Sequence, residues 1–412
     1  MGDRFRPRLA WIVPTVEAGG VGPVALETTS AMAVSGRCEA TLVETHAAPW
    51  SDRTREGLRR VALDMGESRA SASVVLDWLR DNPQHVLFTN GVSHLNGIFP
   101  YIPRDALHVA VLHDASRRYR DDVMSYAAYL DGVVAVSDYV HDWARKDLHT
   151  IGFSGIVRRI HNGTNYPAAP SRASAAGPLR LLFVGNMWLK GGSRLAAIAK
   201  ALRRHGVDFH LTVIGEDAAQ VERQLDKAGL QERVTWHRRL RREELWRTYA
   251  AHDVLLMLSW GESFGMVTIE AMGMGCVPVA YDVPSGSREI IEPGISGILA
   301  HPNSRAIATA LAGLSPARLL KMSAEASRRA RTHFSAERAA QKYLELIDDL
   351  MRSKDIAGGS RLGATTTTRG VESPVRSPIA RIYHALPSSW RNRIRKGLGA
   401  YPIGAAWLRE RL

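Results

Sequence analysis

The chain has 412 residues, a length that predicts two to three domains with sizeable hydrophobic cores. Its 45% apolar, 23% charged and 7% aromatic residues are near the averages for globular proteins, and no apolar run reaches the roughly 18 residues of a membrane span. Length and composition therefore exclude a disulfide-stapled miniature scaffold and an integral membrane protein.

The net charge of +13 is concentrated at one end of the chain. Residues 351–412 contain 12 Lys and Arg against three acidic residues, so they carry +9 and leave a nearly neutral body. This distribution indicates an anionic surface, such as phospholipid headgroups, as a partner of the tail, and argues against a nucleic-acid enzyme. Cys38 and Cys276 are far apart in the sequence, so we expect two buried thiols and neither a disulfide framework nor a zinc site.

The first half of the chain alternates apolar runs with amphipathic stretches. We expect helices over residues 71–84 and 137–148, and buried parallel strands over residues 8–16, 38–45, 85–90, 107–113 and 132–137. The alternation predicts a doubly wound α/β domain, which we place at residues 1–166. The first apolar run is short and enters a glycine loop, so it is interpreted as a strand instead of a secretory signal, and we expect a cytoplasmic protein.

A linker rich in Pro, Ala and Ser follows at residues 165–178, and the pattern then restarts. We place a second Rossmann-like domain at residues 178–335, with strands over 179–186, 210–216 and 276–282 and a helix over 265–275. A long amphipathic helix covers residues 336–352.

Residues 353–412 predict a flexible linker followed by a basic amphipathic tail. In the tail, Trp390, Ile394 and Leu398 recur at helical spacing among arginines, and Pro387 and Pro402 limit the helix to about three turns. The hypothesis is that residues 379–412 bind an anionic membrane surface, which would make the protein peripheral on the inner face of the cytoplasmic membrane. A partner-binding or disordered tail is the alternative.

Ligands of open parallel sheets bind outside the carboxyl ends of the strands, so the residues after each strand are the first candidates. Gly19 and Gly20 lie in a loop after the first strand whose backbone can approach a ligand, although a tight turn explains them equally well. His113 stands at a strand tip, where an imidazole can bond a sugar hydroxyl or move a proton, although a lone histidine is more often structural.

The second domain offers a cation and two carboxylates at equivalent places. Lys190 follows Asn186 in a loop at the entrance to a helix, which suits a diphosphate, with a solvated lysine as the alternative. Glu262 lies in a glycine-bracketed loop, and Glu270 comes about a turn into a helix that starts near Met266. The two carboxylates suit a sugar and a ribose at opposite ends of a diphosphate, unless Glu270 merely faces solvent.

Together these residues resemble the GT-B glycosyltransferases of family 4. The similarity covers about residues 8–350 and includes, in the family's order, the sequences RRIHNGTN, LLFVGN, KGG, GESFGMVTIEAMGMGCVPVA and SGSREII. The resemblance implies two Rossmann-like domains facing a cleft, with the acceptor bound mainly by the first and the donor by the second. It also implies that the helix at 336–352 crosses back to the first domain.

The resemblance assigns roles residue by residue. It implies that Glu262 holds donor-sugar hydroxyls, that Lys190 binds the diphosphate and that His113 touches the sugar near the reacting centre. The donor-binding residues that it implies are Gly19, Gly20, Asn186, Ser263, Phe264, Gly265, Met266, Val267 and the ribose ligand Glu270. The family usually has arginine at the position of Asn186, and the candidates to supply the missing charge are Arg288 and the cluster Arg117, Arg118 and Arg120.

The implied activity is that of a retaining hexosyltransferase in surface polysaccharide or lipopolysaccharide assembly. A nucleotide-diphosphate sugar is the donor, a hydroxyl of a glycan or lipid-linked acceptor attacks on the same face, and the departing phosphate acts as the base. Fixed positive groups and helix N-termini can stabilise the leaving diphosphate, and the sequence has no D-x-D motif, so we expect no metal and no cofactor. No nucleic-acid partner is expected.

Two alternatives to a transferase stay open. One is a GT-B relative with another reaction, such as a nucleotide-sugar epimerase or a phosphorylase, and the spacing of Glu262 and Glu270 argues against it. The other is a sugar-binding scaffold without transferase activity, for which Asn186 is the only hint.

Overall fold

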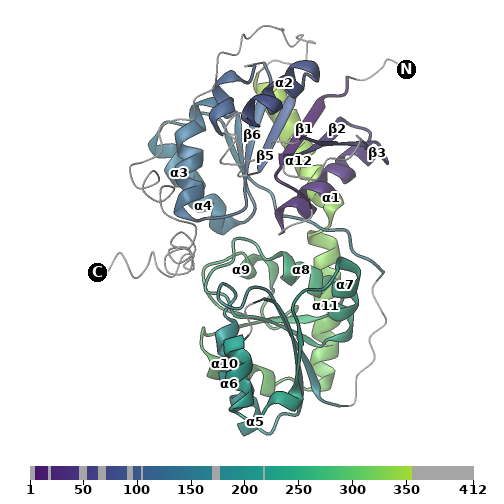
Figure 1. Cartoon of the computed structure of the whole chain (residues 1–412), viewed down its shortest axis with the longest axis vertical. Helices are drawn as coiled ribbons and strands as arrows, with labels where there is room; N and C mark the ends of the chain where they lie inside the picture. Colours follow the sequence, from purple (N-terminus) through teal and green to yellow (C-terminus); the bar gives the residue numbers. More distant parts are fainter. Residues whose placement is uncertain are drawn as a thin grey trace. The chain divides into compact units, whose positions relative to one another are not determined.

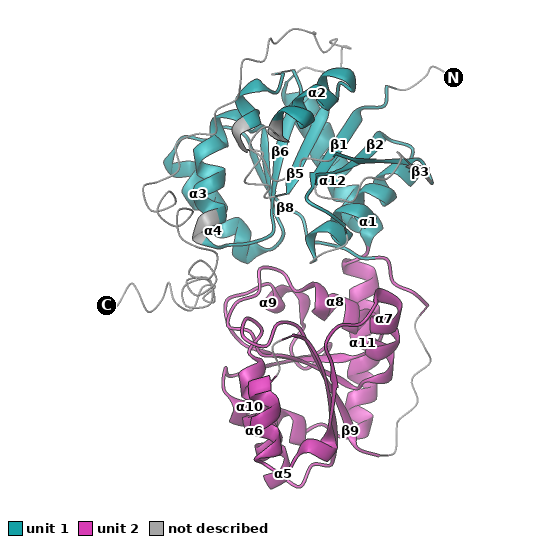
Figure 2. Ribbon diagram, in the orientation of Figure 1, with its two compact units in different colours: residues 1–164, 336–391 teal, residues 165–335, 392–412 magenta. Residues whose placement is uncertain are grey.

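The computed structural model divides the chain into two units, each built on a parallel sheet (Figure 2). Unit 1 holds the described residues of Met1–Thr164 together with helix α12 (Ala336–Ser353), and unit 2 holds those of Asn165–Ser335. The structure describes residues 5–16, 20–45, 53–63, 71–90, 96–103, 105–168, 177–216 and 219–354. The amphipathic tail at residues 379–412 lies outside these ranges and stays a prediction.

Unit 1 contains a sheet of eight strands. In spatial order the strands are β3 (Arg53–Arg55), β4 (Leu58–Ala62), β2 (Glu39–Glu44), β1 (Arg8–Val13), β5 (Val86–Asn90), β6 (Leu107–Leu112), β7 (Gly132–Ala135) and β8 (Ile156–Arg159). All neighbours pair in parallel except β3 and β4, which form an antiparallel hairpin at one edge. The other helices of unit 1 are α1 (Val21–Val34), α2 (Ser71–Asp81), η1 (Asn96–Tyr101), α3 (Arg117–Tyr126), η2 (Ala127–Tyr129) and α4 (Asp138–Thr150).

Helix α12 packs on the central strands of unit 1. Trp11 of β1 lies opposite Phe88 of β5 in the register, and their rings stack with centroids 4.9 Å apart. Tyr343 of α12 contacts both rings edge-on, at 4.8 Å and 5.5 Å. Residues on the other face of the same strands, such as Ile12 and Leu87, join a second apolar cluster with α2 and η1. Central strands covered on both faces must be apolar throughout, and this is why they stand out as continuous apolar runs in the sequence.

Unit 2 contains a sheet of six parallel strands (Figure 1). In spatial order they are β11 (Val234–His237), β10 (Phe209–Ile214), β9 (Leu179–Val184), β12 (Val254–Met257), β13 (Val277–Tyr281) and β14 (Ile298–Ala300). The helices are η3 (Gly192–Arg194), α5 (Leu195–Arg204), α6 (Ala219–Asp226), η4 (Gln231–Arg233), α7 (Arg242–Ala251), α8 (Met266–Gly273), α9 (Ser287–Ile290), α10 (Ser304–Ala312) and α11 (Pro316–His333).

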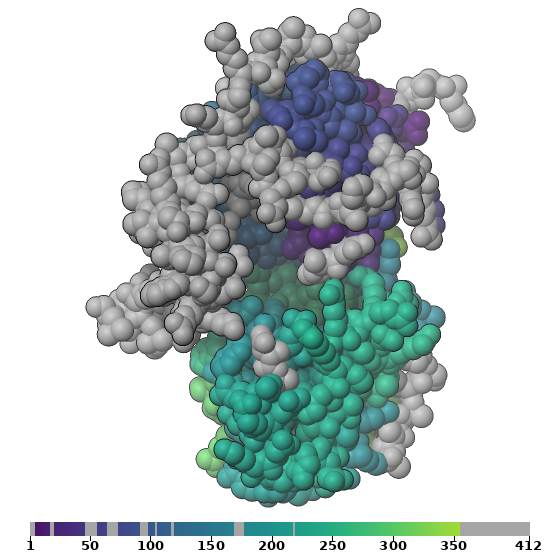
Figure 3. All heavy atoms as spheres, in the orientation of Figure 1, coloured from purple at the N-terminus to yellow at the C-terminus, as the bar shows by residue number. Residues whose placement is uncertain are grey.

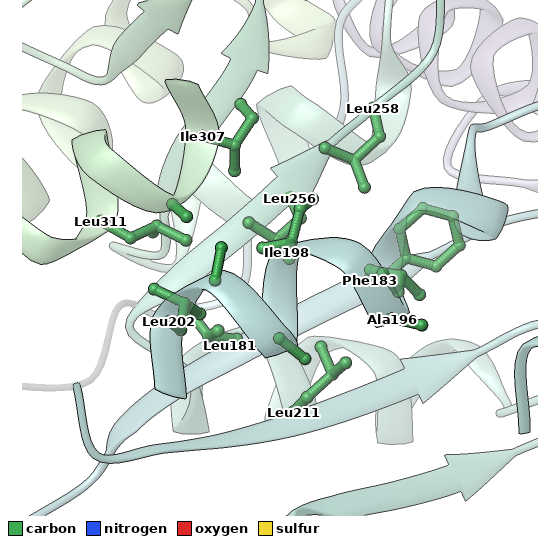
Figure 4. Close-up of a cluster of buried hydrophobic side chains, with 14 of the residues drawn as sticks. Leu181, Phe183, Ala196, Ile198, Leu202, Leu211, Leu256, Leu258, Ile307 and Leu311 are labelled. Carbon is green, nitrogen blue, oxygen red and sulfur yellow. The ribbon is translucent and has the colours of Figure 1, made fainter. Parts of the chain in front are cut away.

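Helices cover both faces of the second sheet. Figure 1 shows α5, α6 and α10 on one side and α7, α8 and α11 on the other, and α5 contacts α10 as α8 contacts α11. On the first side, Leu181, Leu211 and Leu256 pack against Ile198 and Leu202 of α5 (Figure 4). In the space-filling view, the teal and green residues of unit 2 form one closely packed surface (Figure 3). The strands that lead into the loops at the carboxyl edge are therefore packed between helices.

Several elements of the structure were not predicted from the sequence. These are the hairpin β3–β4, strand β8 and the helices α3, α10 and α11. Cys38 and Cys276 are both buried and free, as expected. None of the described helices is long and apolar enough to cross a membrane.

Candidate functional site

An ion pair joins two loops at the carboxyl edge of the second sheet. Lys190 lies in the loop after β9 and Glu262 in the loop after β12, and these two strands are neighbours. The Nζ atom of Lys190 donates to both Glu262 carboxylate oxygens, each at 2.7 Å. The Glu262 side chain is only 13% exposed, and Ser259 Oγ donates to its Oε2 at 3.1 Å. The structure therefore brings together two of the three residues predicted to be catalytic.

Gly191 lets the Lys190 loop reach the end of β12. Its backbone has φ +78°, and a Cβ atom at this position would stand 2.1 Å from the carbonyl oxygen of Leu258. Since Leu258 lies one residue beyond β12, only glycine allows this approach. The close contact of the two backbones places Lys190 beside Glu262.

The Glu262 loop ends at the N-terminus of α8. Gly265 occupies the N-cap position with φ +114°, and no side chain caps the helix. The backbone N–H groups of the first turn, at the half-buried Met266 and Val267, therefore point out of the helix end, where they can donate to an anion or a hydroxyl. The Glu262 carbonyl accepts from the Gly286 N–H at 2.8 Å, which ties this loop to the one after β13.

Phe264 anchors the same loop through its buried side chain. Its side chain is 3% exposed, and its ring meets Phe334 at 5.8 Å. The side chain is thus part of the core of unit 2, so only the backbone of Phe264 is available to a ligand. Ser263, the preceding residue, is half-buried.

Glu270 lies on α8 and has a fixed partner. Its Oε2 accepts from the Tyr249 hydroxyl of α7 at 3.0 Å, and Tyr249 is fully buried. Burial, followed by the Glu270 charge, raises the pKa of Tyr249 well above its usual value, so the phenol stays protonated and donates. Glu270 is half-buried, and its carboxylate is held by a side chain of the neighbouring helix α7.

Asn186 organises the Lys190 loop. It is exposed, its Oδ1 accepts from the N–H groups of Trp188 and Leu189 at 3.0 Å each, and its carbonyl accepts from the Lys190 N–H at 2.9 Å. These bonds fix the turn from which Lys190 projects, a role that asparagine suits well.

The arginines proposed to replace a charge at Asn186 have other surroundings. Arg288 pairs with Asp282 at 2.7 Å. Arg120 pairs with Asp147 at 2.6 Å and stacks over Trp143 at 5.4 Å. The side chains of Arg117 and Arg118 lie outside the described residues. Each described arginine of this set is thus already neutralised by a carboxylate.

The third predicted catalytic residue, His113, belongs to unit 1. It follows β6 directly, and its Nε2 is buried without a hydrogen-bond partner among the described residues. Burial lowers the pKa of His113 to about 4, so the imidazole is neutral near pH 7 and offers a hydrogen bond, not a charge. His113 thus belongs to a different unit from Lys190 and Glu262.

The glycine loop of unit 1 is described only in part. Gly19 lies outside the described residues, and Gly20 is the N-cap of α1 with an ordinary right-handed backbone. Glu44, at the end of β2, holds the start of this loop because its Oε1 accepts from the Val16 N–H at 2.9 Å while its Oε2 pairs with Arg60 at 2.6 Å. A buried acid after an apolar strand was the signal that the sequence analysis missed.

The edge of unit 2 thus offers, within two adjacent loops and one helix start, an ammonium group, a half-enclosed carboxylate, oriented N–H groups and a second carboxylate. Anions, vicinal hydroxyls and ribose hydroxyls are the groups that these partners bind. Among the residues the structure describes, no group of three or more His, Cys, Asp and Glu side chains is arranged to hold a metal ion.

Comparison with known proteins finds a family model that matches part of the second unit. Residues 178–315 match the family model described as glycosyl transferases group 1. A D-inositol 3-phosphate glycosyltransferase of Pseudarthrobacter chlorophenolicus is 32% identical over 198 residues, 45% of this chain and 44% of the relative. A lipopolysaccharide 1,6-galactosyltransferase of Salmonella typhimurium is 28% identical over 133 residues, 31% of this chain and 36% of the relative. The chain spans less than half the length of these curated relatives.

Solved structures support the fold over most of the chain. Sucrose-phosphate synthase from Thermosynechococcus elongatus matches with a TM-score of 0.70 and 20% identity, covering 84% of this chain and 100% of that chain. Anabaena HepE in complex with UDP and glucose matches with a TM-score of 0.64 and 17% identity, covering 84% of this chain and 100% of that chain. The predicted GT-B fold class, two Rossmann-like sheets with helices on their faces, is confirmed.

Proposed function

Because residues 178–315 form a glycosyl transferases group 1 domain, we propose that this chain is a glycosyltransferase that moves a sugar from a nucleotide-diphosphate sugar to an acceptor hydroxyl. The observation that carries the proposal is the contact of Lys190 with both oxygens of Glu262 at 2.7 Å, at the carboxyl edge of a parallel sheet. A cation and a carboxylate at this edge match the two ends of a sugar diphosphate.

Each candidate residue is expected to bind a different part of the donor. Lys190 and the N–H groups at the start of α8 hold the diphosphate and stabilise the charge that develops on it as it leaves. Glu262 accepts hydrogen bonds from sugar hydroxyls, and Glu270, oriented by Tyr249, accepts from the ribose. His113 of unit 1, neutral near pH 7, bonds a hydroxyl near the reacting carbon.

The finer proposal is a retaining reaction of family 4 type, without a metal. The acceptor hydroxyl attacks on the face that the diphosphate leaves, and the diphosphate takes its proton. Retention is tested by NMR of the product's anomeric configuration, and metal independence by an unchanged rate in EDTA. An inverted product or a rate restored only by Mg²⁺ or Mn²⁺ overturns the respective part.

The proposed acceptor is a hydroxyl of a glycan or glycolipid in surface polysaccharide assembly. Support comes from the similarity to a lipopolysaccharide galactosyltransferase and from the basic residues 379–412. Sedimentation with anionic liposomes, comparing the full chain with a truncation after Arg352, tests the membrane part of this proposal. Equal partitioning of the two proteins contradicts it.

A panel of UDP, GDP and ADP sugars tests the activity itself, with thermal stabilisation and release of the nucleoside diphosphate as readouts. The Lys190→Ala and Glu262→Ala variants are expected to lose turnover by at least about 100-fold, the scale of lost transition-state charge stabilisation. Matched controls are Lys342→Ala and Glu345→Ala, because these residues form a Lys–Glu pair of the same 2.7 Å length on α12 of unit 1. Binding without turnover for every donor would favour the inactive sugar-binding scaffold.

A further inference from the structure

Two exposed indoles stand on the two loops that the Lys190–Glu262 pair joins. Trp188 is 55% exposed and Trp260 is 46% exposed. Among the described residues, these are the tryptophans classed as exposed. Trp188 precedes Lys190 by two residues, and Trp260 precedes Glu262 by two. Large aromatic side chains left in water beside polar groups are typical of binding surfaces.

Trp260 is held in place from one side. The guanidinium of Arg194 lies over its ring, with Cζ 5.3 Å from the centroid, and also over the ring of Tyr281 at 5.7 Å. Tyr281 is buried and lies 6.1 Å from the Trp260 ring, tilted by 58°. The indole is therefore contacted by a cation that also lies over a core aromatic ring, while nearly half of its surface stays open.

Arg194 has no other charged partner within the described parts of the chain. It occupies the N-cap position of α5, four residues after Lys190, and forms no ion pair with a described carboxylate. Its guanidinium thus has the two rings as its partners, through cation–π attraction. Its cation–π contact therefore restricts the orientation of the Trp260 ring.

Trp188 differs from Trp260 in this respect. Its backbone N–H donates to Asn186, but its ring makes no ring or cation contact with described residues. The two indoles are therefore similar in exposure and in sequence separation from the ion pair but differ in ring contacts, which makes Trp188 a matched control.

We propose that Trp260 is a stacking platform for a pyranose ring, with Arg194 as the positioning residue that holds the platform. The proposal rests on the proposed function and names a further specificity residue of the same site. A pyranose presents C–H groups on one face and hydroxyls at its rim, so it packs on an indole while a carboxylate two residues away accepts from its hydroxyls. The ring belongs to the donor sugar or to a sugar of the acceptor, and the experiment separates these sources.

The donor arm measures by calorimetry the dissociation constants of UDP and UDP-glucose, or of the nucleotide pair that the donor panel identifies. The ratio of the UDP constant to the UDP-glucose constant measures how much the sugar contributes to binding. Trp260→Ala is expected to lower this ratio by about fivefold to tenfold and to leave the dissociation constant of the nucleotide unchanged. Trp260→Phe retains part of the effect and Trp188→Ala retains all of it. Thermal unfolding checks that each variant is folded.

The acceptor arm measures the acceptor KM and the hydrolysis of the donor without acceptor. If the platform takes an acceptor sugar, Trp260→Ala raises the acceptor KM by about the same factor and leaves hydrolysis unchanged. If Trp260→Ala changes neither the donor ratio nor the acceptor KM, or if Trp188→Ala is the variant that changes them, the platform is overturned. A wild-type protein that binds no nucleoside diphosphate overturns the proposed function instead.

Arg194→Ala tests the positioning role. We expect it to shift the same constant as Trp260→Ala in a smaller measure, with rescue by Arg194→Lys, which keeps a cation over the ring. In the Trp260→Ala background it should have no further effect, because the two residues act as one unit. Arg242→Ala is the control, since Arg242 stacks over Trp246 at 5.6 Å on α7. Additive losses from Arg194 and Trp260 contradict the positioning role.

Discussion

At the residue scale, the Lys190–Glu262 contact has a consequence for how a donor binds. The two charges neutralise each other at 2.7 Å, with Lys190 35% exposed and Glu262 13% exposed. Under the proposed function, a diphosphate is expected to compete with Glu262 for the ammonium, whereas sugar hydroxyls replace the ammonium as donors to Glu262. We therefore expect binding of a whole sugar nucleotide to exchange one internal ion pair for two ligand contacts.

Glu44 forms a buried ion pair in unit 1, and its loss should destabilise that unit more than the loss of an exposed ion pair. It is 1% exposed, and its removal leaves both the Val16 N–H and the Arg60 charge without this acceptor. We expect Glu44→Ala to lower the unfolding free energy by about 3 kcal/mol, the low end for breaking a buried pair. Hydrogen exchange of the β1 and β2 amides measures the loss.

Asp348→Ala is the control for this prediction, because Asp348 pairs with Arg37 on the surface, where the side chains are 47% and 46% exposed. Exposed pairs contribute about 0–1 kcal/mol. Equal effects of the two substitutions would contradict the importance assigned to burial.

Two histidines with lowered pKa values, the buried His108 and the partly buried His113, make the stability of unit 1 depend on pH. Burial lowers the pKa of His108 to about 3 and that of His113 to about 4, below the ordinary value of 6.5. Below pH 6.5 the unfolded chain takes up protons that the folded chain refuses, so stability is complete above that pH and is lost as the pH falls toward 4. Each histidine contributes a slope of about 1.4 kcal/mol per pH unit.

The comparison of wild type with His108→Gln between pH 7 and pH 4.5 isolates one histidine. The difference in unfolding free energy between the two proteins should shift with pH in favour of the variant as the pH falls. A difference that is constant over this range would show that His108 titrates normally.

At the element scale, the site depends on the meeting of two loops from neighbouring strands. Gly191→Ala would put a Cβ 2.1 Å from the Leu258 carbonyl and would push the Lys190 loop away from β12. We expect this variant to lose nucleoside diphosphate binding to the same extent as Lys190→Ala. Thermal shift with the nucleotide measures it.

Gly206→Ala separates the clash from simple backbone strain. Gly206 follows α5 with φ +70°, close to the +78° of Gly191, but a Cβ there would meet nothing within 4 Å. Strain at a positive φ costs both variants about 1–2 kcal/mol of stability, and only Gly191→Ala should lose nucleotide binding. Retained binding in Gly191→Ala would contradict the role of the close approach.

Helix α12 is expected to stabilise unit 1 and not unit 2. Tyr343 is 2% exposed and contacts Trp11 and Phe88, so Tyr343→Ala should cost unit 1 about 3–5 kcal/mol. Hydrogen exchange should then increase in β1 and β5 and stay constant in β9 and β12. Lys342→Ala, on the exposed face of the same helix, should change neither set, and a parallel loss in both units would contradict the assignment.

The strands of unit 1 that the sequence predicted are those buried on both faces of the sheet. Strands β1, β5 and β6 have helices on both faces and appear as apolar runs. The hairpin β3–β4 lies at a sheet edge and is rich in arginine, which hides it from this criterion. Its signal was the pair Glu56 and Gly57, which turn with φ 51° and 81°. Two positive φ values fit a two-residue hairpin loop.

The candidate site was predictable in its residues but not in its contacts. Lys190 and Glu262 both follow apolar strands, and the rule for parallel sheets placed them at the same edge. Lys190 and Glu262 are 72 residues apart in the sequence, and they pair directly because β9 lies next to β12 in the sheet. No local sequence pattern predicts that these two strands are neighbours. The partnership of Tyr249 with Glu270 was missed for the same reason, because it joins two helices through tertiary packing.

At the scale of the whole molecule, the chain distributes its candidate residues over two separately packed units. Unit 2 carries the ion pair, the start of α8 and Glu270, while unit 1 carries His113 and the glycine loop. The aromatic contacts of Tyr343 attach the last described helix to unit 1 although it follows unit 2 in the chain. We therefore expect nucleotide binding to depend on residues of unit 2 and sugar transfer to need residues of both units.

The most direct test of the central claim is the calorimetric dissociation constant of the nucleoside diphosphate for wild type, Lys190→Ala and Glu262→Ala. We expect Lys190→Ala to weaken binding of the nucleoside diphosphate by at least about tenfold, the effect of losing a charged hydrogen bond. We expect equal or tighter binding in Glu262→Ala, because that substitution releases Lys190, although sugar transfer is lost. Equal weakening in both variants, or none in Lys190→Ala, would contradict the assignment of the diphosphate to Lys190 and of the sugar to Glu262.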